Sequence, residues 1–240
     1  MSGKSQEKGA LRKLDRKLVN RWIFYILGML VLALGLTLNT KAGLGVSPII
    51  SIAFAVSEIW GLNFGDMTFL LYALFVLRQF ALRGRDSRMT DLLQLPLSLV
   101  FSRVLNLYSA LIPYEAAEHG FGMNLLLLLA AILFTGAGAG AAITVNMRLV
   151  PNPGDGIVAA VAEKIGRDQG FAKNLFDVGC VAVTCVLGLL ASGGIVGIGI
   201  GTVAAMIGVG RSIFMVNWLG KERMCRAAGL LRTEAVPCGE

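Results

Sequence analysis

The sequence predicts an all-α fold, a polytopic membrane helix bundle made of two related halves. Three observations lead to this prediction: an apolar composition, a series of long apolar runs and an internal repeat. Of the 240 residues, 55% are hydrophobic and only 15% are charged, whereas soluble domains carry about 25% charged residues. The predicted solvent is therefore lipid, and no stretch is left that could form a second, water-soluble domain.

The apolar runs supply the predicted membrane spans. A helix that crosses a bilayer needs about 20 mostly apolar residues. Six runs are read as full spans: 22–40, 67–82, 92–113, 122–146, 175–192 and 195–219. Two shorter runs, 46–61 and 154–166, each follow a break rich in glycine and proline, so we expect half-helices that start at the breaks. The first run is too long for a signal peptide and lacks a cleavage motif, which predicts a retained helix.

An internal repeat relates the two halves by a shift of 105 residues. The shift places Gly35 on Gly140, Leu44 on Leu149, Pro48 on Pro153, Glu58 on Glu163, Gly61 on Gly166 and Gly65 on Gly170. The expected organisation is a basic cytoplasmic tail (1–21), a first membrane repeat (22–112), an acidic external loop (113–121), a second membrane repeat (122–219) and a cytoplasmic C-terminal tail (220–240).

The distribution of lysine and arginine predicts the topology. With six spans, 19 of the 22 basic residues lie on the cytoplasmic side and Lys41 alone lies outside, as basic residues do in membrane proteins. If both short segments also cross, giving eight spans, 14 lie inside and six outside. Six spans place both termini in the cytoplasm of a bacterial cytoplasmic membrane. Three spans per half make the second half inverted, which is typical of transporters and channels.

The breaks and the charges within the spans supply the candidate site. Two half-helix N-termini would point their partial positive charges at a shared centre. A mid-span arginine is costly and therefore indicates function; we expect Arg103 to pair with Asp155 or, failing that, with Asp177. The residues expected to face a common polar cavity near the bilayer midplane are Ser47, Pro48, Arg103, Asn152, Asp155 and, as a candidate partner, Asp177. The alternative is that each break is an ordinary surface loop and that Asp177 simply pairs with Lys173 four residues earlier.

These features predict a transporter or channel for a small solute. The half-helix N-termini and Arg103 favour an anionic solute, whereas Asp155 and Asp177 would suit a cation or a proton. The alternative function is a non-transporting membrane scaffold or regulator. The expected partners are the lipid bilayer and a small solute or ion, and a homo-oligomer is left open.

Other function classes are not expected. No enzyme activity is predicted, because the single histidine, His119, falls in the external loop. The four cysteines have no metal-ligand spacing, so neither a metal, another cofactor nor a disulfide is expected. The net charge of +7 resides in tails and loops beside apolar runs, which argues against a nucleic-acid partner.

Several of these motifs resemble those of the YczE-like family of bacterial membrane proteins, which is grouped with the YyaS and YitT proteins. The resemblance covers residues 22–216 and rests on Leu44-Gly45-Val46-Ser47-Pro48 with Gly61 and Gly65, on Pro153-Gly154-Asp155-Gly156-Ile157, on Asp177, and on Gly193, Gly194, Gly197, Gly199 and Thr202. In the last of these motifs, Ile200 and Gly201 stand as an insertion. The resemblance implies a multi-pass protein of the cytoplasmic membrane and implies no particular substrate.

Overall fold

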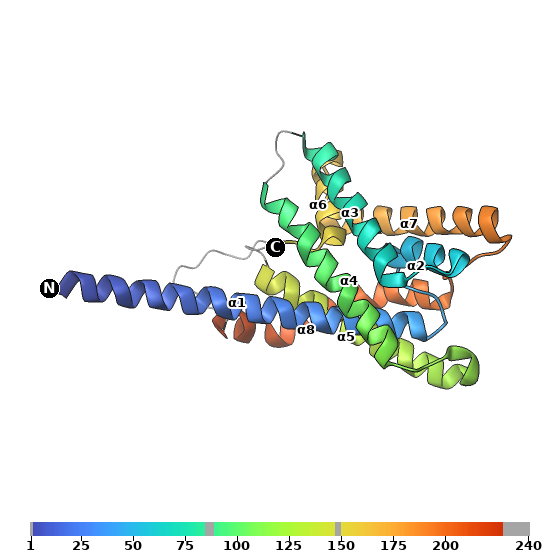
Figure 1. Cartoon of the computed structure of the whole chain (residues 1–240), viewed down its shortest axis with the longest axis horizontal. Coiled ribbons are helices and arrows are strands. Elements are labelled where there is room, and N and C mark those ends of the chain that lie inside the picture. Colours follow the sequence, from blue (N-terminus) through green and yellow to red (C-terminus); the bar gives the residue numbers. More distant parts are fainter. Residues whose placement is uncertain (1, 85–88, 147–149, 228–240) are drawn as a thin grey trace.

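The computed structural model describes residues 2–84, 89–146 and 150–227, and within these ranges the chain forms helices and no strands (Figure 1). The all-α prediction is therefore confirmed. In chain order the elements are α1 (Ser2–Lys41), α2 (Pro48–Trp60), α3 (Phe64–Arg83), η2 (Met89–Leu93), α4 (Gln94–Leu111), η3 (Ala116–Glu118), α5 (Phe121–Asn146), α6 (Pro153–Ile165), α7 (Gln169–Ser192) and α8 (Ile200–Ala227).

Five helical segments in the described ranges are long and apolar enough to cross a membrane. They are Val19–Lys41, Phe64–Arg83, Asp91–Glu118, Phe121–Ala139 and Gln169–Ser192. The sixth predicted span, 195–219, is wrong at its start, because α8 begins at Ile200 and its apolar part, Ile200–Val216, is shorter than the other five. Gly193 and Gly197 have φ angles of 71° and 75°, a left-handed conformation that interrupts a helix.

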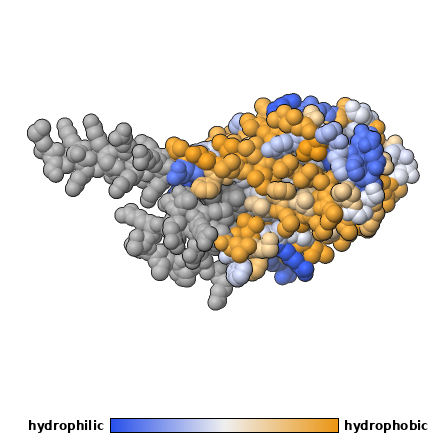
Figure 2. All heavy atoms as spheres, turned by 90° about the horizontal axis from the view of Figure 1, so that it is seen from below, coloured by the Kyte–Doolittle hydropathy of each residue, from blue (hydrophilic) through white to orange (hydrophobic). Residues whose placement is uncertain are grey.

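The outside of the bundle is apolar. Leucines on four different helices are more than half exposed, and Figure 2 shows hydrophobic residues over much of the coloured part of the face that it presents. Examples are Leu77, Leu107, Leu126 and Leu190. A water-soluble protein rarely exposes so much contiguous apolar surface, whereas a bilayer covers it.

Two packing systems hold the bundle together. Helix α1 packs along α5, which also packs against α8, while α2 packs against α7 and α3 against α6. Small residues permit the first system: Gly35 of α1 lies against Thr135 of α5, and Gly136 of α5 lies against Ser212 of α8. Membrane helices commonly use glycine in this way, because the absence of a side chain lets two helix backbones approach closely.

The short helices α2 and α6 have matching ends. Each has 13 residues, starts with a proline and ends at a left-handed glycine, Gly61 with φ 62° and Gly166 with φ 64°. The following helices also start alike, because the side chain of Asn63 accepts a hydrogen bond from the N–H of Asp66 (3.0 Å) and that of Asp168 from the N–H of Phe171 (2.9 Å). The shift of 105 residues relates each of these pairs. The prediction that a helix starts at each break is confirmed.

Candidate functional site

The first break, between α1 and α2, is closed by backbone contacts. The N–H of Val46 donates to the carbonyl of Gly197 (2.8 Å), and the N–H of Gly201 donates to the carbonyl of Leu44 (2.7 Å). Gly45 has a φ of 111°, and a Cβ there would lie 2.5 Å from the backbone nitrogen of Gly199. The glycines between α7 and α8 therefore let that segment lie directly on the first break.

The second break, before α6, is held by two buried glutamines. Gln79 of α3 and Gln94 of α4 exchange side-chain hydrogen bonds of 3.0 and 3.2 Å. The Gln79 amide also donates to the carbonyl of Pro153 (3.2 Å). Both side chains are about fully buried, and a buried amide is stable only when it is hydrogen-bonded. The pair thus fixes the break to α3 and α4.

The first turns of the two short helices meet. A Cβ on Gly154 would lie 2.7 Å from Cδ1 of Ile49, so Ile49 of α2 packs on the bare backbone of α6. The contact is apolar, and the polar residues of the first break do not share it. The backbone N–H of Ser47 donates to the side chain of Asn39 (2.6 Å), and Pro48 is buried.

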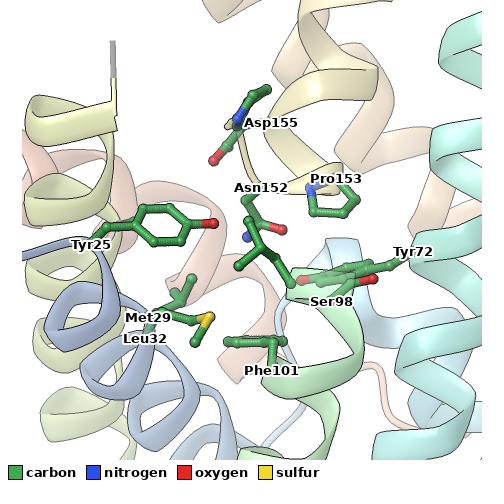
Figure 3. Close-up of a pocket in the computed structure, with 12 residues that line it drawn as sticks. Tyr25, Met29, Leu32, Tyr72, Ser98, Phe101, Asn152, Pro153 and Asp155 are labelled. Carbon is green, nitrogen blue, oxygen red and sulfur yellow. The ribbon is translucent and has the colours of Figure 1, made fainter. Parts of the chain in front are cut away.

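A cavity of about 30 Å³ lies beside the second break, bounded by α1, α3, α4, α5 and α6 (Figure 3). Its polar residues are Tyr25, Tyr72, Ser98, Asn152 and Asp155. Its other lining residues are Met29, Leu32, Leu97, Phe101, Ala139, Pro151 and Pro153. In Figure 3 the hydroxyl of Tyr25 points toward Asn152 and Asp155. The cavity therefore combines one carboxyl group with neutral polar and apolar walls.

The cavity lies at mid-depth along the first span. Val19 starts that span and Lys41 ends it. At a rise of about 1.5 Å per residue, Tyr25 and Leu32 are about 9 and 20 Å from its start, against a hydrocarbon core of about 30 Å. That the site lies near the bilayer midplane stays a prediction.

A pair of charged groups lies on α7, which packs against α6. Lys173 and Asp177 form an ion pair there, with Nζ 3.0 Å from Oδ2. The Lys173 side chain is 39% exposed, whereas that of Asp177 is 3% exposed. The other carboxyl oxygen of Asp177, Oδ1, is buried and has no hydrogen-bond partner. Buried carboxylates normally have their oxygens satisfied.

Arg103 does not belong to this site. Its Nη1 lies 3.0 Å from Oδ1 of Asp66 at the start of α3, and both side chains are exposed. The predicted pairing with Asp155 or Asp177 is therefore wrong. An arginine within a span still needs a carboxylate partner. Asp66 on the neighbouring helix α3 supplies it, instead of a carboxylate at the centre of the bundle.

The structure thus divides the six predicted site residues. Asn152 and Asp155 line the cavity, whereas Ser47, Pro48, Arg103 and Asp177 are not among its lining residues. A ligand-binding role for any of them stays a prediction.

Several residues of the site were not predicted from the sequence. Tyr25, Tyr72 and Ser98 line the cavity, and Gln79 and Gln94 hold the break. The available signal was polarity within apolar runs, because an amide inside a membrane helix must find a partner. Gln79 in particular lies inside a predicted span. The tyrosines gave no such signal, since Tyr is common in apolar helices.

An ion cluster ties the end of α6 to α3. The guanidinium of Arg83 contacts Glu163 through Nε and Nη2, both at 2.9 Å, and contacts Asp91 of η2 at 3.1 Å. Glu163 is 60% exposed at its side chain and Asp91 only 8%. The cluster lies where α3, η2 and α6 converge, so it anchors the end of α6 that is remote from the second break.

No group of three or more metal-ligating side chains occurs among the residues that the structure describes. The cysteines whose surroundings are described, Cys180 and Cys185, are both free and lie in α7. The expectation of no cofactor remains a prediction, because the other two cysteines lie outside the described surroundings.

The chain is similar to other membrane proteins over nearly the whole bundle. Residues 19–217 match the model of a family of unknown function (DUF6198). The chain is also 25% identical over 198 residues to the "Uncharacterized membrane protein YczE" of Bacillus subtilis (strain 168), which covers 82% of this chain and 86% of that protein. No solved structure matches the chain. Together with the apolar helices, these similarities identify a multi-span membrane protein.

Proposed function

Because the chain belongs to the family DUF6198, whose function is unknown, its activity has to come from its site, and we propose that it transports a small cation across the membrane. The transported cation binds in the cavity beside the second break. The observation that carries the proposal is a mid-depth cavity that contains a carboxyl group, Asp155. Ionisable groups inside a membrane bundle typically mark the path of an ion or substrate.

The charge of the cavity favours a cation. Among the described residues that line it, Asp155 has the only carboxyl group, and there is no lysine, arginine or histidine. The expectation of an anionic solute depended on Arg103, and Arg103 pairs with Asp66. The N-terminus of α6 is a partial positive charge, and the carboxylate of Asp155 in its first turn already offsets it. An anion would therefore meet net repulsion.

The size and the lining residues of the cavity restrict the class of cation that can bind there. A water molecule needs about 10–15 Å³ by this measure, so about 30 Å³ holds about two water molecules or one ion with two heavy atoms. Methylammonium has that size. Its ammonium group can donate to Asp155 and Asn152, while its methyl group suits the side of Met29 and Phe101.

The proposal is tested by electrical measurements on the purified protein in liposomes. A rapid change from sodium chloride to methylammonium chloride should produce a current with the natural protein. Asp155→Asn should abolish that current. Asp168→Asn is the matched control, because Asp168 caps α7 outside the cavity and asparagine caps equally well.

Two outcomes would oppose the proposal. One is a current of the same size in Asp155→Asn, which would place the conducting path elsewhere. The other is the absence of any current in the natural protein, with tetraethylammonium, potassium and methylammonium all inert. The second result would favour the alternative of a non-transporting scaffold or regulator.

A further inference from the structure

We infer that the exposed ion pair of Arg103 and Asp66 is the centre of an interface at which two copies of this chain associate in the membrane. Arg103 lies in α4 and Asp66 in the first turn of α3, with Nη1 3.0 Å from Oδ1. Their side chains are 61% and 44% exposed. Neither residue lines the cavity, so the interface does not depend on the proposed transport.

The pair lies on a face of the bundle that is otherwise apolar. At a rise of about 1.5 Å per residue, Arg103 is about 13 Å from the start of α4 and about 12 Å from its end. One helical turn to either side of it, Leu99 and Leu107 are 40% and 55% exposed, and Leu70, one turn after Asp66, is 57% exposed. This face of α3 and α4 therefore meets either lipid or another protein.

Lipid is a poor neighbour for the two charges. Charged side chains within membrane spans almost always face the interior of a bundle or a water-filled cavity, because a charge in lipid is costly. The contact within the chain compensates only in part. Asp66 Oδ1 is buried and has no hydrogen-bond partner among the described residues, although Nη1 lies 3.0 Å away. A guanidinium has five N–H donors, so Arg103 can donate to a further carboxylate.

The charges of the pair identify the partner. A complementary surface has to offer a carboxylate to Arg103 and a cation to Asp66, side by side. A second copy of the chain offers both when a two-fold axis lies along the membrane normal, because each arginine then faces the carboxylate of the other copy. An anionic lipid headgroup offers only a negative charge and would repel Asp66. Such polar contacts, together with close packing, hold membrane helices together, since lipid is as apolar as leucine.

Two charge-reversal variants test the contact between copies. Arg103→Glu places two acidic groups at the interface and Asp66→Arg places two basic groups there, so each variant alone should be monomeric. Co-expressed with different affinity tags, the two should form a mixed dimer, which a role of the pair within one chain does not predict. The measurement is the mass of the species in lipid nanodiscs, where one chain weighs 25.5 kDa. Leucine at both positions removes both contacts and should weaken the dimer about tenfold or more.

Crosslinking through a single cysteine tests the same face without altering the charges. With the four native cysteines replaced by alanine, Leu107→Cys should be joined to its counterpart in the second copy by a bis-maleimide that enters membranes. Val186→Cys on α7 is the matched control, because Val186 is also 55% exposed, and it should stay uncrosslinked. A natural protein with the mass of one chain, or crosslinking that is absent at Leu107→Cys or equal at the two positions, would overturn the inference.

Discussion

The hydroxyl oxygens of Ser51 and Thr184 lie 2.7 Å apart in the buried contact between α2 and α7. The shift of 105 residues carries Ser51 onto Gly156 and Thr184 onto Gln79. Gly156 and Gln79 also meet, in the contact between α6 and α3, where a Cβ on Gly156 would lie 2.5 Å from Oε1 of Gln79. Contacts that are exchanged in this way between two halves are those of a two-fold arrangement. The direction of the axis relative to the membrane stays a prediction.

Cysteine labelling tests whether the halves are inverted in the membrane. After the four native cysteines are replaced by alanine, Glu115→Cys should react from outside intact cells with a reagent that does not cross membranes. Met89→Cys, which is 76% exposed between α3 and α4, should react only after the membrane is opened. Arg85, on the same connection, lies outside the described residues.

The opposite labelling pattern would contradict the inverted arrangement. That opposite pattern is the one expected of the eight-span alternative, in which the connection after α3 is external and the acidic loop with Glu115 is cytoplasmic. A single cysteine at Glu118, in the same loop as Glu115, should behave like Glu115→Cys and serves as the control for local accessibility.

Gly45→Ala should destabilise the closed first break. An alanine would have to adopt a φ of 111° and would bring its Cβ against the backbone of Gly199, at a cost of about 1–3 kcal/mol. Thermal unfolding of the purified protein should therefore occur at a lower temperature. Gly194→Ala is the control, since a Cβ there would meet no atom within 4 Å. Equal stability of the two variants would argue against the contact.

Gln79→Leu should destabilise the second break. The change leaves the Gln94 amide and the Pro153 carbonyl without their partner, and each unsatisfied buried group costs about 1–3 kcal/mol. Gln94→Leu added to Gln79→Leu should restore part of the stability, because both amides are then gone. A double-mutant cycle on thermal unfolding measures this coupling. Simple additivity of the two substitutions would contradict it.

Arg103→Leu should lower stability without affecting the cavity. It leaves Asp66 without its ion-pair partner, which costs about 1 kcal/mol for exposed pairs in water. Adding Asp66→Leu should recover stability. The methylammonium current should stay that of the natural protein in both variants, because neither residue lines the cavity. Loss of the methylammonium current in a stable double variant would indicate that Arg103 takes part in the site after all.

The sequence predicted most of the fold because its signals are local. Apolar length set five of the six expected spans, and the proline and glycine residues of the breaks set where α2 and α6 begin and end. The start of α8 was missed because the apolar run 195–199 continues through residues that are not helical. Hydropathy counts these residues as part of the span, whereas the left-handed conformation of Gly197 interrupts the helix.

The site was predictable only in part, because it depends on contacts between distant segments. Asn152 and Asp155 were found through the break that contains them. The partner of Arg103 was predicted wrongly. Its position within a span and the free-energy cost of a charge in lipid indicate that it needs a carboxylate, but they do not identify which carboxylate lies nearest. The role of Tyr25 depends on how α1, which packs against α5 and α4, brings it to the cavity, and no local pattern in the sequence encodes that packing.

The central claim is that the cavity beside the second break is accessible from water and selects cations. Ser98 lines this cavity, and Ser98→Cys on the cysteine-free background places a thiol there. Silver ion, a single-atom cation that binds thiols, should remove the free thiol of this variant quickly, because Asp155 attracts cations to the cavity. Methylammonium should slow the loss of the free thiol, and Asp155→Asn should remove both effects. A thiol that silver ion does not bind, or binds at the same rate in the presence of methylammonium and in Asp155→Asn, would contradict the account.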